Sequence, residues 1–497
     1  MSATRFPPMK RIIHWFRRDL RVSDNTALSE AVKRADSVIP VFIFEDAFRT
    51  GPDVGAARLE FLLQSVESLR KNLLELGHPL VVRCGKSEEI LPALCQETEA
   101  QAVFANKRYE PYAQKRDERM TAALLKIGVG FELFKDAVIW EETDILNLSG
   151  KPYTVFTPYS KAWQAKPVPP PRTRLAIRSP QFPVRDFKPD ALPVSSAECG
   201  HPLTQQIPPG GERAALETLK IFMAGPVYDY GGNRNFPALD GSSHLSPHLR
   251  AGTIGIRTIL AELKKARGKI SPAVGAVKLK PEDSPVLAAA ASTRLASCDV
   301  FLKELIWREF YMQVLHNFPH VTRGAFRPEY DALKWSDNEE HFAAWCAGQT
   351  GYPIVDAAMR CLNATGTMHN RLRMVVAMFL TKDLLIHWQW GERYFMRQLV
   401  DGDMAANNGG WQWSAGTGTD AAPYFRIFNP VSQGEKFDAE GKFVRRWIPE
   451  LKDFSNDLIH QPWENPLLFS KSNYAPRIVL HEEQRPKCLA MFKAAKG

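Results

Sequence analysis

The sequence predicts an α/β domain built on a doubly wound parallel sheet, followed by a larger all-α domain. A chain of 497 residues is longer than one hydrophobic core usually organises, so two domains are expected. Short apolar runs alternate with helical patterns in the first part of the chain, whereas the pattern is mainly helical from Leu216 onward. Hydrophobic residues make up 44% of the chain and charged residues 24%, as in ordinary soluble globular proteins.

Five short apolar runs predict the strands of the sheet. They cover residues 12–16, 38–44, 80–82, 102–105 and 131–134, and helical patterns at 56–76 and 112–127 lie between them. Alternation of this kind is typical of parallel strands with helices on both faces. The first strand-to-helix turn, Arg17–Asp24, has no G-x-G-x-x-G sequence. A glycine-rich motif that binds the phosphates of a nicotinamide dinucleotide is therefore excluded at this turn.

The region between the two domains is rich in proline. It has 11 prolines among the 48 residues from 165 to 212, too many for a helix or a central strand. We therefore predict an α/β domain over residues 1–150, an extended connector over 151–212 and a helical domain over 213–497. Within the helical domain, residues 266–293 are rich in Ala, Pro and Lys and predict an irregular, flexible surface insertion.

Two polar segments precede the central helices of the second domain. Tyr230–Pro237 is predicted as a loop, and Asp240–Leu249 places serines before a helix whose first turn would contain Pro247. Free amides at such a helix start favour phosphate, but ordinary capping by serine explains the same residues. Further along, residues 302–311 predict an amphipathic helix that carries on one side Glu304, Trp307 and Arg308.

The positive charge of the chain is unevenly distributed. Residues 1–150 hold 21 Lys and Arg against 22 Asp and Glu, whereas residues 151–497 hold 43 against 33. A polyanion would therefore bind the second part of the chain, and nucleic acid is the usual partner of such a surplus. Charge that merely keeps the protein in solution is the alternative.

The sequence carries no signal for a metal cluster, a disulfide framework or a membrane span. Its seven cysteines are never closer than eleven residues and form no C-x-x-C pair, so disulfides, zinc and iron–sulfur clusters are not expected. No run approaches the ~18 apolar residues of a membrane span, and the N-terminal residues lack a signal-peptide pattern. A cytoplasmic protein without a bound metal is therefore expected.

Two runs, Gly366–Met374 and Asp401–Trp413, concentrate polar and aromatic side chains. They combine amides, guanidiniums, carboxylates and indoles, a mixture that suits a large heteroaromatic ligand. A helix predicted over residues 370–386 would direct several of these groups to one place, and Gly409–Gly410 would let backbone approach the ligand. Alternatively, Arg373 forms a structural ion pair with an Asp and the tryptophans fill the core. The density of polar groups favours a ligand, because each group would otherwise need a buried partner.

Several motifs, taken together, resemble those of the photolyase/cryptochrome family, and within it the bacterial class I cyclobutane pyrimidine dimer photolyases. The resemblance covers nearly the whole chain and is carried by His14–Arg21, Tyr109–Asp117, Gly351–Arg360, Met368–Met374, Asp401–Trp413 and Arg426–Pro430. It implies a Rossmann-like α/β domain and an all-α FAD-binding domain.

The resemblance also implies light-driven DNA repair by a monomer. Reduced FAD would donate an electron to a cyclobutane pyrimidine dimer flipped out of DNA and split it into monomeric pyrimidines. One alternative is a cryptochrome-type blue-light photoreceptor with little or no repair activity, which usually carries a long C-terminal extension. Another is a basic DNA-binding module with a vestigial flavin site.

Family positions imply which residues bind FAD. Serine hydroxyls and helix-start amides would hold the diphosphate, an Arg–Asp pair would lie beside the flavin, and the amide of Asn407 would face its N5 atom. An amide at that position argues for repair, because plant cryptochromes carry an Asp there. The matching residues are Tyr230, Ser242, Ser243, Leu245, Ser246, Glu304, Arg308, Asn370, Arg373, Asp401, Asp403 and Asn407.

Further positions match residues that act on the lesion. Asn407 is counted with this set because it tunes the flavin. The residues expected to touch the dimer are Glu304, Asn370 and Met374; the aromatic walls are Trp307 and Trp413; the phosphate contacts are Arg234 and Arg371. A chain of three tryptophans would relay electrons inward to reduce oxidised FAD under light: Trp335, Trp388 and Trp411.

A second, light-harvesting chromophore is expected in the N-terminal domain, with Arg58 and Glu110 lining its site. Arg108 stands where deazaflavin binders tend to have an acid, so folate (5,10-methenyltetrahydrofolate) is favoured over deazaflavin. FMN and an empty site stay open. The chain also departs from many relatives at three positions, which are Thr367 in place of Trp, Phe301 in place of Trp and Ser242 in place of Thr.

Overall fold

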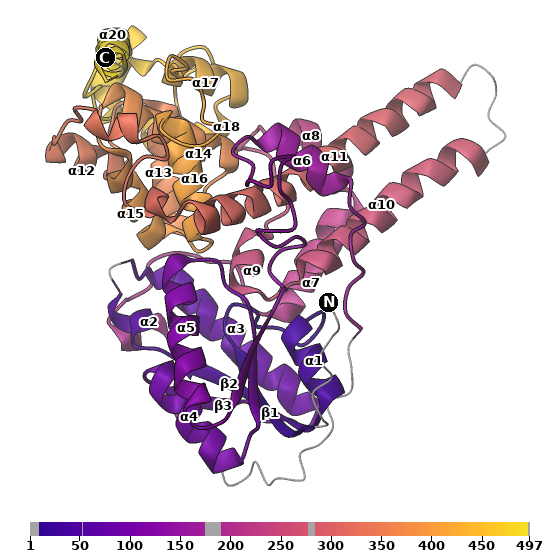
Figure 1. Ribbon diagram of the computed structural model, residues 1–497. Helices are drawn as coiled ribbons and strands as arrows, with labels where there is room; N and C mark the ends of the chain where they lie inside the picture. Colours follow the sequence, from indigo (N-terminus) through magenta and orange to yellow (C-terminus); the bar gives the residue numbers. More distant parts are fainter. Residues whose placement is uncertain (1–8, 52, 174–189, 277–283, 496–497) are drawn as a thin grey trace.

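The computed structural model describes residues 9–51, 53–173, 190–276 and 284–495. The chain forms an α/β part at its N-terminal end and a larger helical part, which lie against one another (Figure 1). The fold class predicted from the sequence is confirmed. Within the described residues, no helix combines the length and apolar character needed to cross a membrane.

The sheet has five parallel strands in the order β3-β2-β1-β4-β5. The two longest strands lie next to each other at its centre and pair from Met9 opposite Ala35 to Phe16 opposite Phe42. The predicted strands are all present, with bounds β1 Met9–Phe16, β2 Ala35–Phe44, β3 Val81–Cys84, β4 Ala102–Asn106 and β5 Gly130–Phe134.

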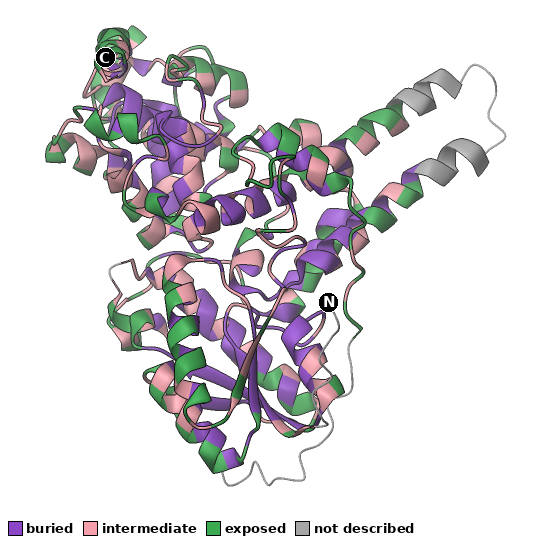
Figure 2. Ribbon diagram, viewed as in Figure 1, coloured by how far each residue is buried: buried purple, intermediate pink, exposed green. Residues whose placement is uncertain are grey.

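Helices cover both faces of the sheet because successive side chains of each strand point to opposite sides. On one face, Ile12 and Phe16 of β1 pack with α1 and α3; on the other, Ile13 and Trp15 pack with α4 and α5. Figure 2 shows the resulting band of buried residues along the strands. The helices of this part are α1 Thr26–Arg34, α2 Ala47–Thr50, α3 Ala56–Glu75, α4 Ser87–Thr98 and α5 Pro111–Leu125.

In the described residues of the predicted connector there is one longer helix, α6 Phe156–Gln164, and a short 3₁₀ turn, Ser196–Cys199; the rest of that described part is mostly irregular. Phe156, Tyr159 and Trp163 of α6 are buried in a cluster with residues of the helical part. From residue 190 onward the connector contacts the α/β part, where the Asp190 amide donates to the Val82 carbonyl at 3.1 Å. The proposed domain boundaries at residues 150 and 212 stay predictions.

The helical part contains the remaining helices. They are α7 Glu212–Ala224, α8 Tyr230–Asn233, α9 Ser246–Ala251, α10 Ile256–Ala276, α11 Ser284–Asn317, α12 Glu339–Ala347, α13 Pro353–Thr365, α14 Asn370–Met378, α15 Trp388–Gln398, α16 Met404–Ala415, α17 Pro430–Phe437, α18 Lys442–Trp447, α19 Pro466–Ser472 and α20 His481–Ala494.

Two predictions for this part need correction. The segment 266–293 is not an irregular insertion: α10 continues to Ala276, α11 begins at Ser284, and the two helices project together from the body (Figure 1). Residues 277–283 of that segment lie outside the described residues. The predicted loop at residues 230–237 begins with one helical turn, α8. By contrast, Pro247 lies in the first turn of α9, as expected.

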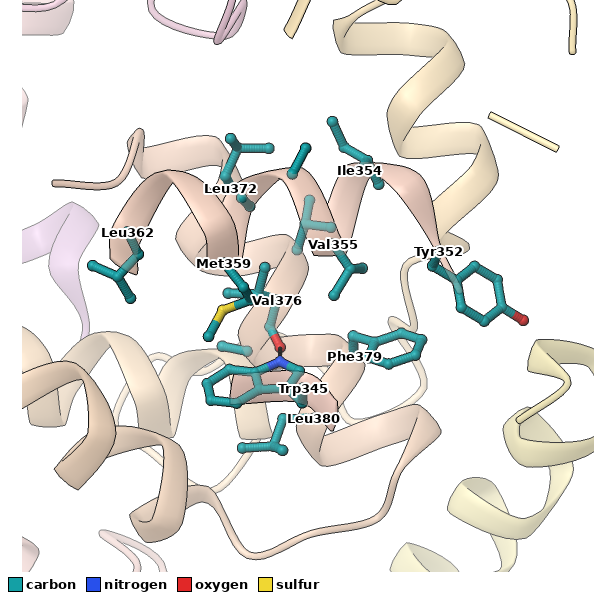
Figure 3. Packing of buried hydrophobic residues seen from close by; sticks show 14 of the residues in the cluster. Trp345, Tyr352, Ile354, Val355, Met359, Leu362, Leu372, Val376, Phe379 and Leu380 are labelled. Carbon is teal, nitrogen blue, oxygen red and sulfur yellow. Dashed lines mark hydrogen bonds between the residues drawn. The ribbon is translucent and has the colours of Figure 1, made fainter. Parts of the chain in front are cut away.

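The core of the helical part lies where α13 and α14 pack on α12, α15 and α16. Trp345 is fully buried at its centre, and its indole donates a 3.1 Å hydrogen bond to the Val376 carbonyl (Figure 3). The helix predicted from Asn370 to residue 386 ends earlier, since α14 passes at Met378 into a π-helical turn, Phe379–Asp383. This packing fixes the start of α14, where the polar run is.

Buried ion pairs join the two parts of the molecule. Arg257 at the start of α10 donates to Asp24 at 2.8 Å and to Asp136 at 2.6 Å, and Arg21 donates to Asp136 at 2.6 Å. All four side chains are at most 5% exposed. Because buried charges are costly unless paired, these groups fix how the helical part sits on the sheet.

Candidate functional site

A cavity of about 400 Å³ opens in the helical part beside the start of α14 and the end of α16. Three residues expected from the sequence line it, namely Arg371, Met374 and Trp413. The other lining residues come from α17 and the segment before it, and sequence reasoning did not assign them to the site: Arg426, Phe428, Gln433, Lys436 and Phe437. The Arg426–Pro430 motif was the signal that pointed to this segment.

Two polar atoms at this cavity are buried and have no hydrogen-bond partner, Arg371 Nε and Gln433 Oε1. The rest of the Arg371 guanidinium is fixed, since it donates to Asn235 Oδ1 at 2.7 Å and lies 4.4 Å from the Phe437 ring centroid. Burial and the nearby Arg234 lower the pKa of Arg371. A ligand that carries both a hydrogen-bond acceptor, for Arg371 Nε, and a donor, for Gln433 Oε1, would satisfy both atoms.

The Arg373 guanidinium donates to both carboxylate oxygens of Asp401, at 2.8 and 3.1 Å, and to the Met368 carbonyl at 2.9 Å. Thus the two polar runs found in the sequence meet at an ion pair. The Asp401 side chain is 6% exposed and that of Arg373 is 29% exposed. Because a bidentate Arg–carboxylate pair has a fixed geometry, it can hold the planar guanidinium in one orientation beside a bound ligand.

Asp403 caps α16 by accepting from the amides of Ala405 and Ala406 at 3.1 and 3.3 Å. It also forms a short ion pair with Arg18 of the α/β part. Burial would raise the pKa of Asp403, but the nearby Arg18 holds the pKa below its ordinary value. The first strand-to-helix turn of the sheet therefore contacts the second polar run directly.

Glu304 on α11 pairs with Arg234, which follows α8, at 2.5 Å. The Arg234 guanidinium also lies 5.5 Å from the Tyr230 ring centroid. Burial, followed by the charge of Glu304, raises the pKa of Tyr230 to about 12, so its hydroxyl stays protonated. These three predicted residues form one group, in which Arg234 is engaged by a carboxylate.

The amide of Asn407 donates to the Glu392 carbonyl at 2.9 Å, and that of Asn408 donates to the Glu392 carboxylate at 2.8 Å. Burial raises the pKa of Glu392 to about 7. Sequence reasoning missed Glu392, because only the packing of α15 against α16 brings it to Asn407. Asn370, the first residue of α14, is exposed.

The predicted diphosphate segment precedes α9. Its Leu245 amide donates to Ser243 Oγ at 3.4 Å; Ser242 is half-buried and Ser246 is exposed. Arg308 of α11 reaches the other end of α9, where it donates to the Leu249 carbonyl at 3.4 Å.

Burial lowers the pKa of Arg308, and so does the charge of Arg18. A phosphate anion near this guanidinium would offset both effects. The hydroxyls and amides before α9, together with this guanidinium, are groups that bind phosphate, so the residues present fit a bound dinucleotide cofactor.

A smaller cavity of about 30 Å³ lies between the α/β and helical parts. Glu110 forms ion pairs there with Arg18 and Arg108, and Arg250 and Arg308 also line it. Burial and the surrounding arginines hold the pKa of Arg250 well below its ordinary value. Arg58 is not among the lining residues, and it donates to backbone carbonyls of Asp53 and Met396.

The three tryptophans of the expected relay lie in one region. Trp388 and Trp411 are buried in the same cluster, and Trp335 packs on it half-buried. Trp411 lies 5.0 Å from the Phe395 ring and 6.1 Å from the Trp345 ring. Trp388 and Trp411 therefore lie in the interior of the helical part, and Trp335 is more exposed than either.

Trp307, expected as an aromatic wall, stacks on Phe156 with ring centroids 3.7 Å apart and planes 6° apart. One face of Trp307 is therefore covered by the connector helix α6. Trp413, the other expected wall, borders the larger cavity.

Two family models match the chain. The one described as DNA photolyase matches residues 12–174, and the one described as the FAD binding domain of DNA photolyase matches residues 301–494. The chain is 39% identical to the deoxyribodipyrimidine photo-lyase of Vibrio cholerae, a similarity that covers 97% of this chain and 99% of the relative.

Two solved structures are also similar. A bacterial class III photolyase from Agrobacterium tumefaciens matches with a TM-score of 0.85 and 37% identity, over 100% of both chains. A cryptochrome from Synechocystis sp. PCC6803 matches with a TM-score of 0.82 and 26% identity, over 98% of this chain and 100% of that one. Because a class III structure is this similar, the expected class I subtype stays a prediction.

The second polar run, the cavity beside it and the packed tryptophans all lie within the segment matched by the FAD-binding model. The N-terminal sheet lies within the segment matched by the other. With both parts matched and similarity along nearly its full length, this chain belongs to the DNA photolyase family.

Proposed function

We propose that the chain is a deoxyribodipyrimidine photo-lyase that splits cyclobutane pyrimidine dimers in DNA under light. The observation that carries the proposal is the cavity of about 400 Å³ with apolar and aromatic walls and basic residues around it. Full-length similarity to named photo-lyases supports the same reaction. When bound, reduced FAD supplies the electron that opens the dimer.

Residues of the chain would first hold the cofactor. The Arg373–Asp401 pair presents a guanidinium to the flavin edge while Asp401 neutralises its charge. Asn407 offers a neutral amide, fixed by its bond to Glu392, where a carboxylate would add repulsion to an electron-rich ring. The amides before α9 would hold the diphosphate, and Arg308, at the other end of α9, would add positive charge to the cofactor site.

Other residues would hold the extruded lesion. Met374 and Trp413 give the cavity apolar and aromatic surface on which stacked pyrimidines fit. Arg426 and Lys436 are exposed at its rim and suit the phosphates on either side. Glu304 would accept a hydrogen bond from a pyrimidine edge, for which it must exchange its contact with Arg234.

A light-dependent repair assay tests this function. Enzyme reduced with dithionite would be mixed with an oligonucleotide that contains one thymine dimer and illuminated at blue wavelengths. We expect dimer loss in the light and none in the dark. A protein that binds FAD and leaves the dimer intact would instead be a cryptochrome-type photoreceptor, the alternative supported by the similar cryptochrome structure.

For the antenna, we propose a folate with its anionic tail at the cavity between the two parts. Five cationic side chains line this cavity against four carboxylates, so a carboxylate-bearing ligand is favoured. Glu110 stays in the proposed site, whereas Arg58 would contribute only indirectly. Extraction of purified protein and near-ultraviolet absorbance would identify a folate; a flavin or deazaflavin spectrum would contradict it.

Cytoplasmic location and the monomeric state stay predictions.

A further inference from the structure

The imidazole of His387 lies between two indoles of the expected relay. Its ring centroid is 5.4 Å from that of Trp335 and 5.7 Å from that of Trp388, and it stacks on Trp388 with an angle of 27° between planes. Within the described chain, Trp335 and Trp388 share no direct ring contact. The imidazole is therefore the aromatic group that bridges these two relay positions.

The backbone fixes this arrangement. Trp335 is held near the imidazole because the adjacent Ser336 pairs with Ile386 in an isolated β-bridge and donates to the Leu385 carbonyl at 2.7 Å. Leu385 adopts a left-handed conformation, with a φ of 54°, that turns the chain into α15. His387 then caps α15, its Nδ1 accepting from the Gln389 amide at 3.2 Å.

This cap requires a lone pair on Nδ1, so the observed geometry belongs to the neutral imidazole. Burial lowers the pKa of His387, as does Arg393 on α15, whereas Asp331 and Asp337 act in the opposite direction. A protonated ring would lose the cap and place a cation at the N-terminal end of a helix. It would also place a positive charge against two indoles.

We propose that His387 is a positioning residue that couples Trp335 to Trp388 when neutral and slows electron transfer between them when protonated. The inference rests on the proposed relay and goes beyond it by naming the group that sets its pH dependence.

In the electron-transfer step, one electron leaves the Trp335 indole and fills the hole on Trp388, and no proton needs to move. Light-excited oxidised flavin is the acceptor that creates the first hole. An added thiol finally reduces Trp335. An imidazolium would lie almost equally far from both indoles, 5.4 and 5.7 Å, so its charge alone would change the driving force little. The step would slow because protonation removes the Nδ1 cap that holds the ring between Trp335 and Trp388.

Flash photolysis of the holoenzyme with oxidised FAD tests the proposal. The rate of the Trp335-to-Trp388 step would be followed from about pH 5 to pH 8 with dithiothreitol as final donor. We expect a wild-type rate that falls about tenfold toward low pH, as the cap is lost and the ring leaves its place between the indoles. His387→Asn retains a side chain that can cap a helix and cannot titrate, so its rate should not change with pH.

Two further variants separate this inference from the relay itself. His201→Asn, a histidine of the connector, should reproduce the wild-type profile. Trp388→Phe should abolish photoreduction; if photoreduction persists, the relay is wrong. If the relay holds and His387→Asn keeps the wild-type pH profile, the His387 proposal is wrong.

Unchanged dimer splitting by chemically reduced His387→Asn would support a role confined to the relay. Loss of FAD in this variant would instead show a structural role and contradict the proposal.

Discussion

At the scale of single residues, Glu304 and Glu309 on the same helix α11 have different surroundings. Glu304 is partly exposed and pairs with Arg234, whereas Glu309 is buried and accepts from the Ile139 amide and the Trp163 indole at 2.7 and 2.6 Å. We expect Glu304→Gln to lower repair by about tenfold to a hundredfold and to leave FAD content unchanged, since it alters charge at the lesion. Dimer loss per absorbed photon and the ratio of flavin to protein absorbance would be measured.

Glu309→Gln is the matched control on that helix. It should lower the melting temperature, because a buried acceptor is replaced, while repair per folded molecule stays near wild type. Loss of FAD in Glu304→Gln would show that this carboxylate holds the cofactor and does not act on the lesion.

A second prediction concerns Glu392 and the pH dependence of stability. Burial raises its pKa to about 7, so the folded protein holds a proton that the unfolded chain releases near pH 4. The stability this gives is fully present below that unfolded value and is lost as pH rises through about 7. Glu392→Gln should therefore gain on the order of 1–3 kcal/mol relative to wild type between pH 5 and pH 8. Denaturant unfolding at several pH values checks this.

The exposed Glu435, on α17, gives the control for that series. Glu435→Gln should keep the wild-type pH slope. An equal slope in Glu392→Gln and wild type would show that Glu392 is ionised in the folded protein throughout this range.

At the scale of elements, the strands were predictable because buried parallel strands read as short apolar runs between amphipathic helices. The incorrect prediction of an irregular insertion at residues 266–293 gave more weight to the prolines, which disfavour helix, than to the alanines, which favour it. Pro285 falls in the first turn of α11, where a proline costs little, and the run Ala288–Ala291 that follows favours helix. The early end of α14 was also hidden, since a π-helical turn keeps nearly the same apolar spacing.

The site was predictable where it rests on dense local motifs. Arg373 and Asp401 were named from two such runs, and the structure joins them. Glu392 and His387 were not found, because each gains its neighbours from packing: Glu392 from α16, and His387 from the bridge that holds Trp335. Neither arrangement can be predicted from the sequence alone, because both depend on tertiary contacts.

The helix pair α15 and α16 supports a third prediction. A Cβ atom at Gly391 would lie 2.1 Å from the Trp411 ring, so the two helices touch through the indole. Trp411→Phe keeps an aromatic ring there and removes the readily oxidised group. We expect photoreduction of oxidised FAD to fall by about a hundredfold or more, while chemically reduced enzyme repairs normally. Steady illumination with thiol, followed at flavin wavelengths, measures the first quantity.

Trp390→Phe is the control for this pair, since Trp390 on α15 packs edge-on against Phe342 with ring centroids 5.1 Å apart and has no expected relay role. It should photoreduce like wild type. Undiminished photoreduction in Trp411→Phe would remove Trp411 from the relay.

At the scale of the whole molecule, the ion-pair network around Arg257 joins the sheet to the helical part. Removal of this guanidinium leaves Asp24 and Asp136 buried with less compensation, so Arg257→Met should cost about 3–5 kcal/mol. Arg21 and Arg257 hold the pKa of Asp136 at about 2 against the opposing effect of burial. This stability is present above the unfolded value near pH 4 and is lost as pH falls toward 2.

Thermal unfolding of Arg257→Met would test the contribution of this ion-pair network. Arg213→Met, at an exposed arginine on α7, is the control. Only the first should melt at lower temperature and show a weaker fall in stability below pH 4. Equal melting of both variants would mean that the network adds no net stability to the junction.

DNA binding is also a property of the whole molecule, because the surplus positive charge lies in residues 151–497 while the lesion enters one cavity. Arg426 is exposed at the rim of that cavity and is proposed to contact one phosphate. Arg426→Ala should weaken binding to damaged and undamaged duplexes alike and reduce the slope of log affinity against log salt by about 1. Arg119→Ala, on the exposed face of α5, should leave the slope unchanged. If Arg426→Ala weakens only lesion-specific binding with the salt slope intact, Arg426 reads the flipped bases and not the backbone.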